Sequence, residues 1–260
     1  MPPSPFLHDT GEGRAILLLH AFPVDASQWD AQVAALSDRY RCLRPDAFGC
    51  GSSPPPPPQL TLDAVAASVM AALDSKGVDE LAVVGLSMGG YTAFALLRQH
   101  SSRIRALVLA DTRAGADSDA ARADRRSMAE RVRAEGVEWL VEPMCERLLA
   151  PASLAEAHLV DPVRARIRRC RPEGVAACQE AMAARPDSTG MLAGIAVPTL
   201  VIAGELDIVT PPAEASQMAQ AIPGAGVEII GGAGHLSNLE RPDHFTTAVS
   251  SFLDGAYPAG

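Results

Sequence analysis

Six short apolar runs, separated by segments with helical periodicity, constrain the fold of this chain more than any other feature. After the second run, Leu62, Val65, Val69 and Leu73 recur at three- and four-residue steps, with Thr61 before them as an N-cap. The expected strands are residues 15–20, 41–46, 81–85, 105–111, 198–204 and 227–232. Strands that alternate with helices favour a parallel sheet. We therefore predict the α/β class, with a mostly parallel central sheet flanked by helices.

The alternation stops between the fourth and fifth runs. Residues 113–185 contain only short helical patterns interrupted by prolines, and nothing in them resembles a strand. We expect a core formed by residues 1–112 and 186–260, and an all-helical lid insertion at residues 113–185, called the cap segment below. Because ligands bind at the carboxyl ends of strands in such sheets, and the insertion follows such an end, the cap segment is expected to cover the site.

Charge and hydropathy exclude several classes of function. The net charge of −9 argues against nucleic acid as a partner, because phosphates attract basic surfaces. No window reaches the roughly 18 uninterrupted apolar residues of a membrane span, and residues 1–14 lack the order of a signal peptide. We expect a cytoplasmic protein that does not bind membranes.

The cysteines give a weaker indication of the redox compartment and of metal binding. Their number is odd, they form no Cys-x-x-Cys pair, and they do not cluster with histidine, so we expect free thiols in a reducing compartment and no metal site. These residues are Cys42, Cys50, Cys145, Cys170 and Cys178.

A serine stands where the third run meets a helical pattern. Residues 85–89 read Gly-Leu-Ser-Met-Gly, with Ser87 at the centre. A sharp turn from a strand into a helix exposes such a hydroxyl at the end of the sheet, and it requires small neighbours. We therefore interpret Ser87 as a nucleophile; the alternative is a glycine-rich turn with an incidental serine.

A serine nucleophile needs a base, and the base needs a carboxylate to orient it. Asp207 follows the fifth run and His235 follows the sixth, so all three side chains are expected at one edge of the sheet. Asp111, at the end of the fourth run, is a second candidate for the acid, and we prefer Asp207. The alternative for Asp111 is a helix cap.

The chain resembles the α/β-hydrolase superfamily over nearly its whole length. The segments that carry this resemblance are LLLHAFP (17–23), RPDAFGCGSS (44–53), GLSMGG (85–90), GELDIVTP (204–211) and GHLSNLERPDHF (234–245). Within the superfamily it looks most like the lidded carboxylesterases and 3-oxoadipate enol-lactonases. The resemblance implies that Ser87 is the nucleophile, His235 the general base and Asp207 the orienting acid, and that no cofactor is needed.

The same resemblance implies an oxyanion hole made by the backbone N–H groups of Phe22 and Met88. The family usually has His-Gly where this chain has His20 and Ala21, which would be strained if the loop required a positive φ. Relatives also begin with a β-hairpin, for which this chain has few residues. Either the first strand is missing or residues 5–9 form a minimal edge strand, which could pair with a second copy. We expect a monomer or a weak homodimer.

Candidate pocket residues are less certain than the catalytic ones. Trp29, Trp139, Met144 and Leu148 are expected either to line the pocket or to belong to the core. The arginine-rich residues 164–171 could attract a substrate carboxylate, or they could pair with glutamates of their own segment. The function expected is hydrolysis of a small carboxylic ester or lactone through an acyl-enzyme. The alternatives are a cofactor-free perhydrolase with the same triad and a non-catalytic binding protein of this fold.

Overall fold

A seven-stranded sheet forms the centre of the computed structural model, which describes residues 4–260. The strands are β1 (Leu7–Thr10), β2 (Ala15–Leu19), β3 (Arg41–Pro45), β4 (Leu81–Leu86), β5 (Ile104–Ala110), β6 (Thr199–Gly204) and β7 (Gly226–Ile230), in the order β1-β3-β2-β4-β5-β6-β7. All neighbours are parallel except β1 and β3. Every residue of β2 and β4 is buried, as expected for central parallel strands covered on both faces. The predicted α/β class is confirmed.

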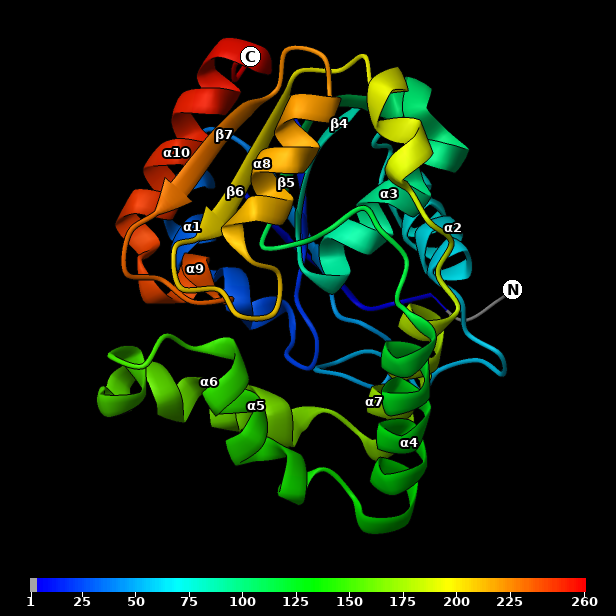
Figure 1. The fold of residues 1–260 in the computed structure, drawn as a ribbon. Helices are drawn as coiled ribbons and strands as arrows, with labels where there is room; N and C mark the ends of the chain where they lie inside the picture. Colours follow the sequence, from blue (N-terminus) through cyan, green and yellow to red (C-terminus); the bar gives the residue numbers. More distant parts are fainter. Residues whose placement is uncertain (1–3) are drawn as a thin grey trace.

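Helices cover both faces of this sheet (Figure 1). They are α1 (Asp30–Leu36), α2 (Leu62–Asp74), α3 (Met88–His100), α8 (Pro212–Ala221), the single turn α9 (Ser237–Glu240) and α10 (Pro242–Ala256). Helix α1 packs on α10, and α2 packs on α3. The Thr61 hydroxyl accepts a hydrogen bond from the Ala64 N–H and so starts α2 at the expected residue.

The cap segment contains four helices and short 3-10 turns, and no strand lies within residues 113–185. The helices are α4 (Asp119–Glu135), α5 (Val141–Leu148), α6 (Ala157–Arg169) and α7 (Pro172–Ala183). Helix α4 packs along α7, and α5 packs against α6. Figure 1 shows all four beyond the carboxyl ends of β6 and β7, the ends at which a parallel sheet presents its ligand site.

The amino-terminal edge of the sheet is not missing a strand. Residues Leu7–Thr10 form β1, which runs antiparallel to β3 and pairs Leu7 with Pro45 and Thr10 with Cys42. Of the two possibilities left open by the sequence, the minimal edge strand is the one that the structure contains.

The expectation of five free thiols is wrong. Cys50, in the loop after β3, forms a disulfide with Cys170, which lies between α6 and α7. The two residues are 120 positions apart, so only the packing of the cap segment on the core brings them together. Cys42, Cys145 and Cys178 are free and buried. The cysteines therefore no longer support a reducing compartment. Among the helices of residues 4–260, none is long and apolar enough to span a membrane.

Candidate active site

Ser87 sits on the turn that joins β4 to α3. Its backbone has φ 55° and ψ −112°, a left-handed conformation that is costly for a residue with a side chain. Gly89 makes this turn possible, because a Cβ there would collide with the carbonyl oxygen of Leu19 on β2. The strained turn holds the Ser87 hydroxyl at the carboxyl end of the sheet, facing a cavity beneath the cap segment.

His235 lies between Ser87 and Asp207. Its Nε2 is 2.8 Å from Oγ of Ser87, and its Nδ1 is 2.8 Å from Oδ2 of Asp207. The His235 side chain is 1% exposed and that of Asp207 is fully buried, so water does not compete for these hydrogen bonds. This arrangement can remove the proton from a serine hydroxyl as it attacks an electrophile.

Asp207 is held as a carboxylate by its surroundings. Its Oδ1 accepts hydrogen bonds from the N–H groups of Val209 and Thr210, and its Oδ2 accepts one from the Thr210 hydroxyl. Burial raises the pKa of Asp207, but the charge of His235 and these hydrogen bonds outweigh burial and hold the pKa below its usual value.

Asp111, the second candidate for the acid, faces a different set of groups. Its Oδ1 accepts from the Gly204 N–H at 2.8 Å, and its Oδ2 pairs with the Ser237 hydroxyl. Burial, and then the negative charge of Asp207, raise the pKa of Asp111 well above its usual value. Asp111 does not hydrogen-bond to His235; it ties the end of β5 to the end of β6 and to α9.

The loop after β2 and the start of α3 carry Phe22 and Met88, the two residues expected for an oxyanion hole. Among the hydrogen bonds of residues 4–260, none takes the N–H of Phe22 as donor, and Met88, at the start of α3, has no acceptor one turn before it. Phe22 and Ser87 line the same cavity. Ala21 does not have a positive φ, so alanine in place of the usual glycine causes no strain.

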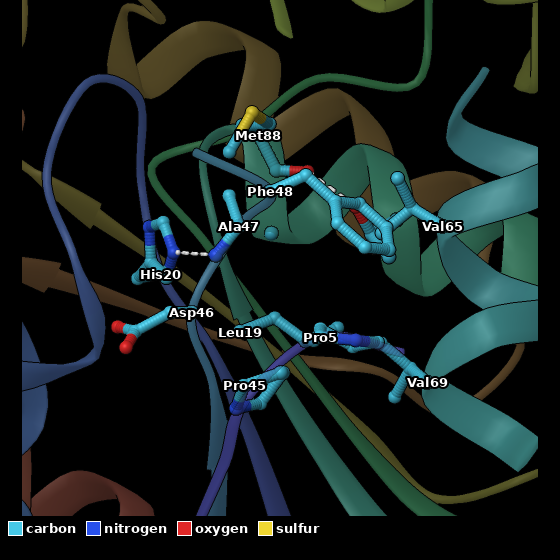
Figure 2. Close-up of a pocket in the computed structure, with 12 residues that line it drawn as sticks. Pro5, Leu19, His20, Pro45, Asp46, Ala47, Phe48, Val65, Val69 and Met88 are labelled. Atoms are coloured by element: carbon cyan, nitrogen blue, oxygen red, sulfur yellow. Dashed lines mark hydrogen bonds between the residues drawn. The ribbon is translucent and has the colours of Figure 1, made fainter. Parts of the chain in front are cut away.

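His20 and Gln28 hold this loop in place. The His20 ring bridges two loops, with Nδ1 2.7 Å from the Ala21 carbonyl and Nε2 2.8 Å from the Ala47 N–H (Figure 2). The Gln28 side chain accepts from the Ala21 N–H and donates to Asn238, which follows His235. These hydrogen bonds therefore join the loop after β2 to the loop after β3 and to α9.

A cavity opens above Ser87, and the space inside it, together with its open mouth, is about 790 Å³. It is lined by Phe22, Ser87, Tyr91, Arg113, Asp117, Ala121, Asp124, Arg125, Met128, Met144, Arg147, Leu148, Gln179, Met182, Val209 and His235. Most of these residues come from the cap segment, whose methionines and Leu148 form the apolar part. Met144 and Leu148, one turn apart on α5, both face this cavity.

The two tryptophans named from the sequence do not line this cavity. Trp29 is fully buried in the core, where its ring lies 5.9 Å from that of Phe245. Trp139 lies under the guanidinium of Arg131, 3.8 Å from it. Both tryptophans belong to the core or pack against it, so the structure agrees with the core alternative and not with the pocket alternative.

The arginine-rich residues 164–171 also lie outside the cavity, and four of their five arginines already have partners. Arg164 binds Glu142 and Asp161, Arg168 binds Glu138, Arg169 binds Asp25, and Arg166 donates to Ser27. These contacts hold α6 on α5 and on the core. The structure thus agrees with the pairing alternative and not with a carboxylate site in this segment.

A second pocket, whose space together with its open mouth is about 340 Å³, is lined by Met88 and His20 among others (Figure 2). Its walls are mostly apolar and include Leu19, Phe48, Val65, Val69 and Met88. Neither Ser87 nor His235 lines it, so a ligand there would not meet the reactive groups. Within residues 4–260 no cluster of three or more metal-binding side chains is present.

Sequence reasoning missed several polar residues of the site. Thr210 follows Asp207 by three residues, and Arg113 follows β5 by three residues, at the edge where strand ends meet. Position relative to a strand end was the available signal for both. Arg147 is three residues after Met144 on α5, a spacing that places both on one helix face.

Comparison with known proteins agrees with this fold. A 3-oxoadipate enol-lactonase from Acinetobacter baylyi is 28% identical over 92% of this chain and 88% of the relative. A solved thermophilic esterase from Thermogutta terrifontis is 39% identical with a TM-score of 0.94, covering 97% of this chain and 93% of the other. An enol-lactonase from Burkholderia xenovorans is 33% identical with a TM-score of 0.89, covering 95% of each chain. The family model of the alpha/beta hydrolase fold matches residues 14–242, and the chain therefore belongs to this family.

Proposed function

We propose that the protein is a serine hydrolase that cleaves a small carboxylic ester or lactone through an acyl-enzyme. The observation that carries the proposal is the unbroken pair of 2.8 Å contacts from Ser87 through His235 to Asp207, at the floor of a cavity. The relatives at 33% and 39% identity, named enol-lactonase and esterase, support it.

In the proposed acylation step, His235 first accepts the proton of Ser87 and then gives it to the leaving alcohol oxygen. Oγ of Ser87 attacks the carbonyl carbon while its proton passes to Nε2 of His235. The oxyanion accepts hydrogen bonds from the N–H groups of Phe22 and Met88, and each such donor typically supplies a factor of about 10² to 10³ in rate. The bond to the alcohol oxygen then breaks, and His235 returns its proton to that oxygen.

Deacylation repeats these steps with water. His235 takes a proton from a water molecule, which attacks the acyl carbon and releases the acid and the Ser87 hydroxyl. In a lactone the alcohol and the acid belong to one product. Asp207 keeps the proton of the neutral ring on Nδ1, so that Nε2 is free to act as a base.

The lining of the cavity supports small apolar substrates. The apolar wall formed by Met128, Met144 and Met182 fits a short acyl or alkyl chain.

The test is release of p-nitrophenolate from the acetate, butyrate and decanoate esters. We expect activity that falls with chain length, and a loss of at least about 10³-fold in kcat/KM for Ser87→Ala. Ser216→Ala, on α8 and outside the cavity, is the matched control. Equal rates in the wild type and Ser87→Ala would refute the proposal; peracid formation without ester hydrolysis would favour a perhydrolase.

A further inference from the structure

The loop after β2 is held from the cap segment as well as from the core. It carries Phe22, whose N–H is one of the two proposed oxyanion donors, and three residues later Asp25. Arg169, the last residue of α6, binds this aspartate, with its Nε 2.8 Å and its Nη2 2.7 Å from Oδ2. An ion pair between the cap segment and the core thus lies close in sequence to the proposed oxyanion hole.

Asp25 is firmly oriented. Its side chain is 4% exposed, and its Oδ1 accepts hydrogen bonds from the N–H group of Ser27 at 3.0 Å and from the Ser27 hydroxyl at 2.6 Å. Burial raises the pKa of Asp25, but the hydrogen bonds from Ser27 and Arg169 outweigh burial and hold the pKa below its ordinary value. Both oxygens of the carboxylate are therefore occupied, and the position of α6 acts on the backbone at Asp25.

Two further residues at the end of α6 contact the same loop. Arg166, on the same face of the helix, donates from Nε to the Ser27 hydroxyl and from Nη2 to the Ser27 carbonyl, both at 3.0 Å. Sγ of Cys170, directly after α6, lies 3.7 Å from the carbonyl oxygen of Pro23 and 3.6 Å from that of Val24. The end of α6 therefore contacts this loop at several points.

The polar contacts of the middle of this loop come from one direction. In the part of the chain that the structure describes, residues 22–25 make hydrogen bonds or sulfur contacts to groups outside residues 20–28 only with Arg169 and Cys170. The hydrogen bonds from the rest of the core reach the residues before and after this stretch instead. The core therefore holds both ends of the loop, and α6 holds its middle.

We propose that Arg169 is a positioning residue of the reaction, which acts through Asp25 to hold the loop so that the N–H of Phe22 points to the oxyanion. The inference rests on the proposed function for the oxyanion, and it adds that the cap segment contributes to the rate as well as covering the cavity. Arg169 does not line that cavity, so its charge acts without touching the substrate. Removal of one oxyanion donor typically costs a factor of about 10² to 10³, so partial displacement of the donor predicts a loss of about tenfold.

The first test is steady-state hydrolysis of p-nitrophenyl acetate by Arg169→Met, which keeps most of the side-chain length and removes its donors. Because the arginine is 49% exposed, loss of the ion pair should leave the protein folded. Both steps of the proposed reaction pass through an oxyanion, so kcat should fall about tenfold, while KM stays within about twofold. Arg169→Lys keeps the charge and a donor, and its kcat should lie within about threefold of the wild-type value.

A trifluoromethyl ketone with a short alkyl chain measures the oxyanion hole itself. Oγ of Ser87 bonds to its carbonyl carbon, the hydroxyl proton passes to His235, and the carbonyl oxygen becomes an oxyanion without loss of a leaving group. The inhibition constant should rise about tenfold in Arg169→Met, in parallel with the fall in kcat. An unchanged inhibition constant overturns the inference even if kcat falls, because the loss then lies outside the oxyanion hole.

Two variants separate a role through Asp25 from a general effect of altering α6. In the Asp25→Asn background, Arg169→Met should lower kcat by less than about threefold further, whereas independent effects would multiply. Arg164→Met is the matched control, because Arg164 lies on the same helix, pairs with Glu142 and lies outside the cavity. It should leave kcat and the inhibition constant unchanged. An equal loss in Arg164→Met, or full multiplication in the double variant, overturns the inference.

Backbone amide exchange separates this inference from the proposed function. If the wild type neither cleaves the ester nor binds the ketone, the proposed function has failed, and the hold of α6 on the loop is then tested on the folded protein. Exchange in a peptide that covers residues 20–28 should be about tenfold faster in Arg169→Met than in the wild type, and unchanged in Arg164→Met. That result supports the hold of α6 on the loop, and exchange that is equal in all three proteins refutes it.

Discussion

Oδ2 of Asp207 lies 2.8 Å from Nδ1 of His235. Asp111 ends the adjacent strand β5 and is equally buried, yet its carboxyl group is occupied by Gly204 and Ser237. Asp207 and Asp111 are therefore two buried acids that follow adjacent strands, and only Asp207 can orient the ring of His235.

Replacement of each acid by its amide separates their roles. Asp207→Asn should lower kcat for ester hydrolysis by about 10³- to 10⁴-fold, because an amide can hold the wrong tautomer of His235. Asp111→Asn should change kcat by less than about threefold, because burial already disfavours its charged form. Steady-state rates on p-nitrophenyl acetate provide the measurement. Equal losses in both variants would mean that Asp111 shares the work of the acid.

Asp117 predicts a pH-dependent contribution to stability. Burial raises the pKa of Asp117, but Arg185 and Arg125 outweigh burial and lower it to about 2, below its ordinary value of 3.8. Because the pKa of Asp117 is lower in the folded than in the unfolded protein, its ion pairs stabilise the fold fully at pH values above the pKa of the unfolded chain. This stabilisation is lost as the pH falls toward the pKa of the folded protein. The shift corresponds to about 2 kcal/mol at neutral pH, of which about 1 kcal/mol should be lost between pH 5 and pH 3.

Urea unfolding of the wild type and Asp117→Asn at pH 3, 5 and 7 checks this expectation. The difference in the free energy of unfolding between the wild type and Asp117→Asn should become smaller toward pH 3. The exposed Asp124→Asn is the control, with an expected change below about 0.5 kcal/mol at each pH. A difference between wild type and Asp117→Asn that is constant with pH would show that the ion pairs of Asp117 are not responsible.

The disulfide predicts both a thiol count and a change in stability. Denatured protein should present three thiols before reduction and five after it. Because the bond closes a loop of 120 residues, Cys170→Ser should lower the free energy of unfolding by about 2 to 4 kcal/mol. A dithiol reductant should lower the stability of the wild type and leave that of Cys170→Ser unchanged. Five thiols without reduction would contradict the structure.

The strands of the sheet could be predicted because the sequence pattern that specifies each strand lies within a few consecutive residues. Each apolar run is short and bounded by polar or turn residues, and β2 to β7 form within a residue or two of the expected limits. The turn at Ser87 has the same local character, since the glycines that permit it are adjacent in sequence. Asp207 and His235 follow strand ends, and parallel strands bring such ends together.

What could not be predicted depends on contacts between distant residues. The pairing of Cys50 with Cys170 requires α6 to pack on the core, which no spacing indicates. Trp29 has the size of a pocket residue but is enclosed by the core. Whether an arginine is free or paired is decided by its neighbours in space, so the sequence could not show that Arg164 and Arg168 are paired with Glu142 and Glu138.

The central claim is that Ser87 is the nucleophile, and covalent trapping tests it most directly. A phosphonofluoridate transfers its phosphonyl group to an activated serine with loss of fluoride, and peptide mass spectrometry locates the modified residue. The account predicts one phosphonyl group per chain, on Ser87, with labelling lost in Ser87→Ala and strongly slowed in His235→Ala. Labelling at another serine, or equal labelling of Ser87→Ala, would contradict it.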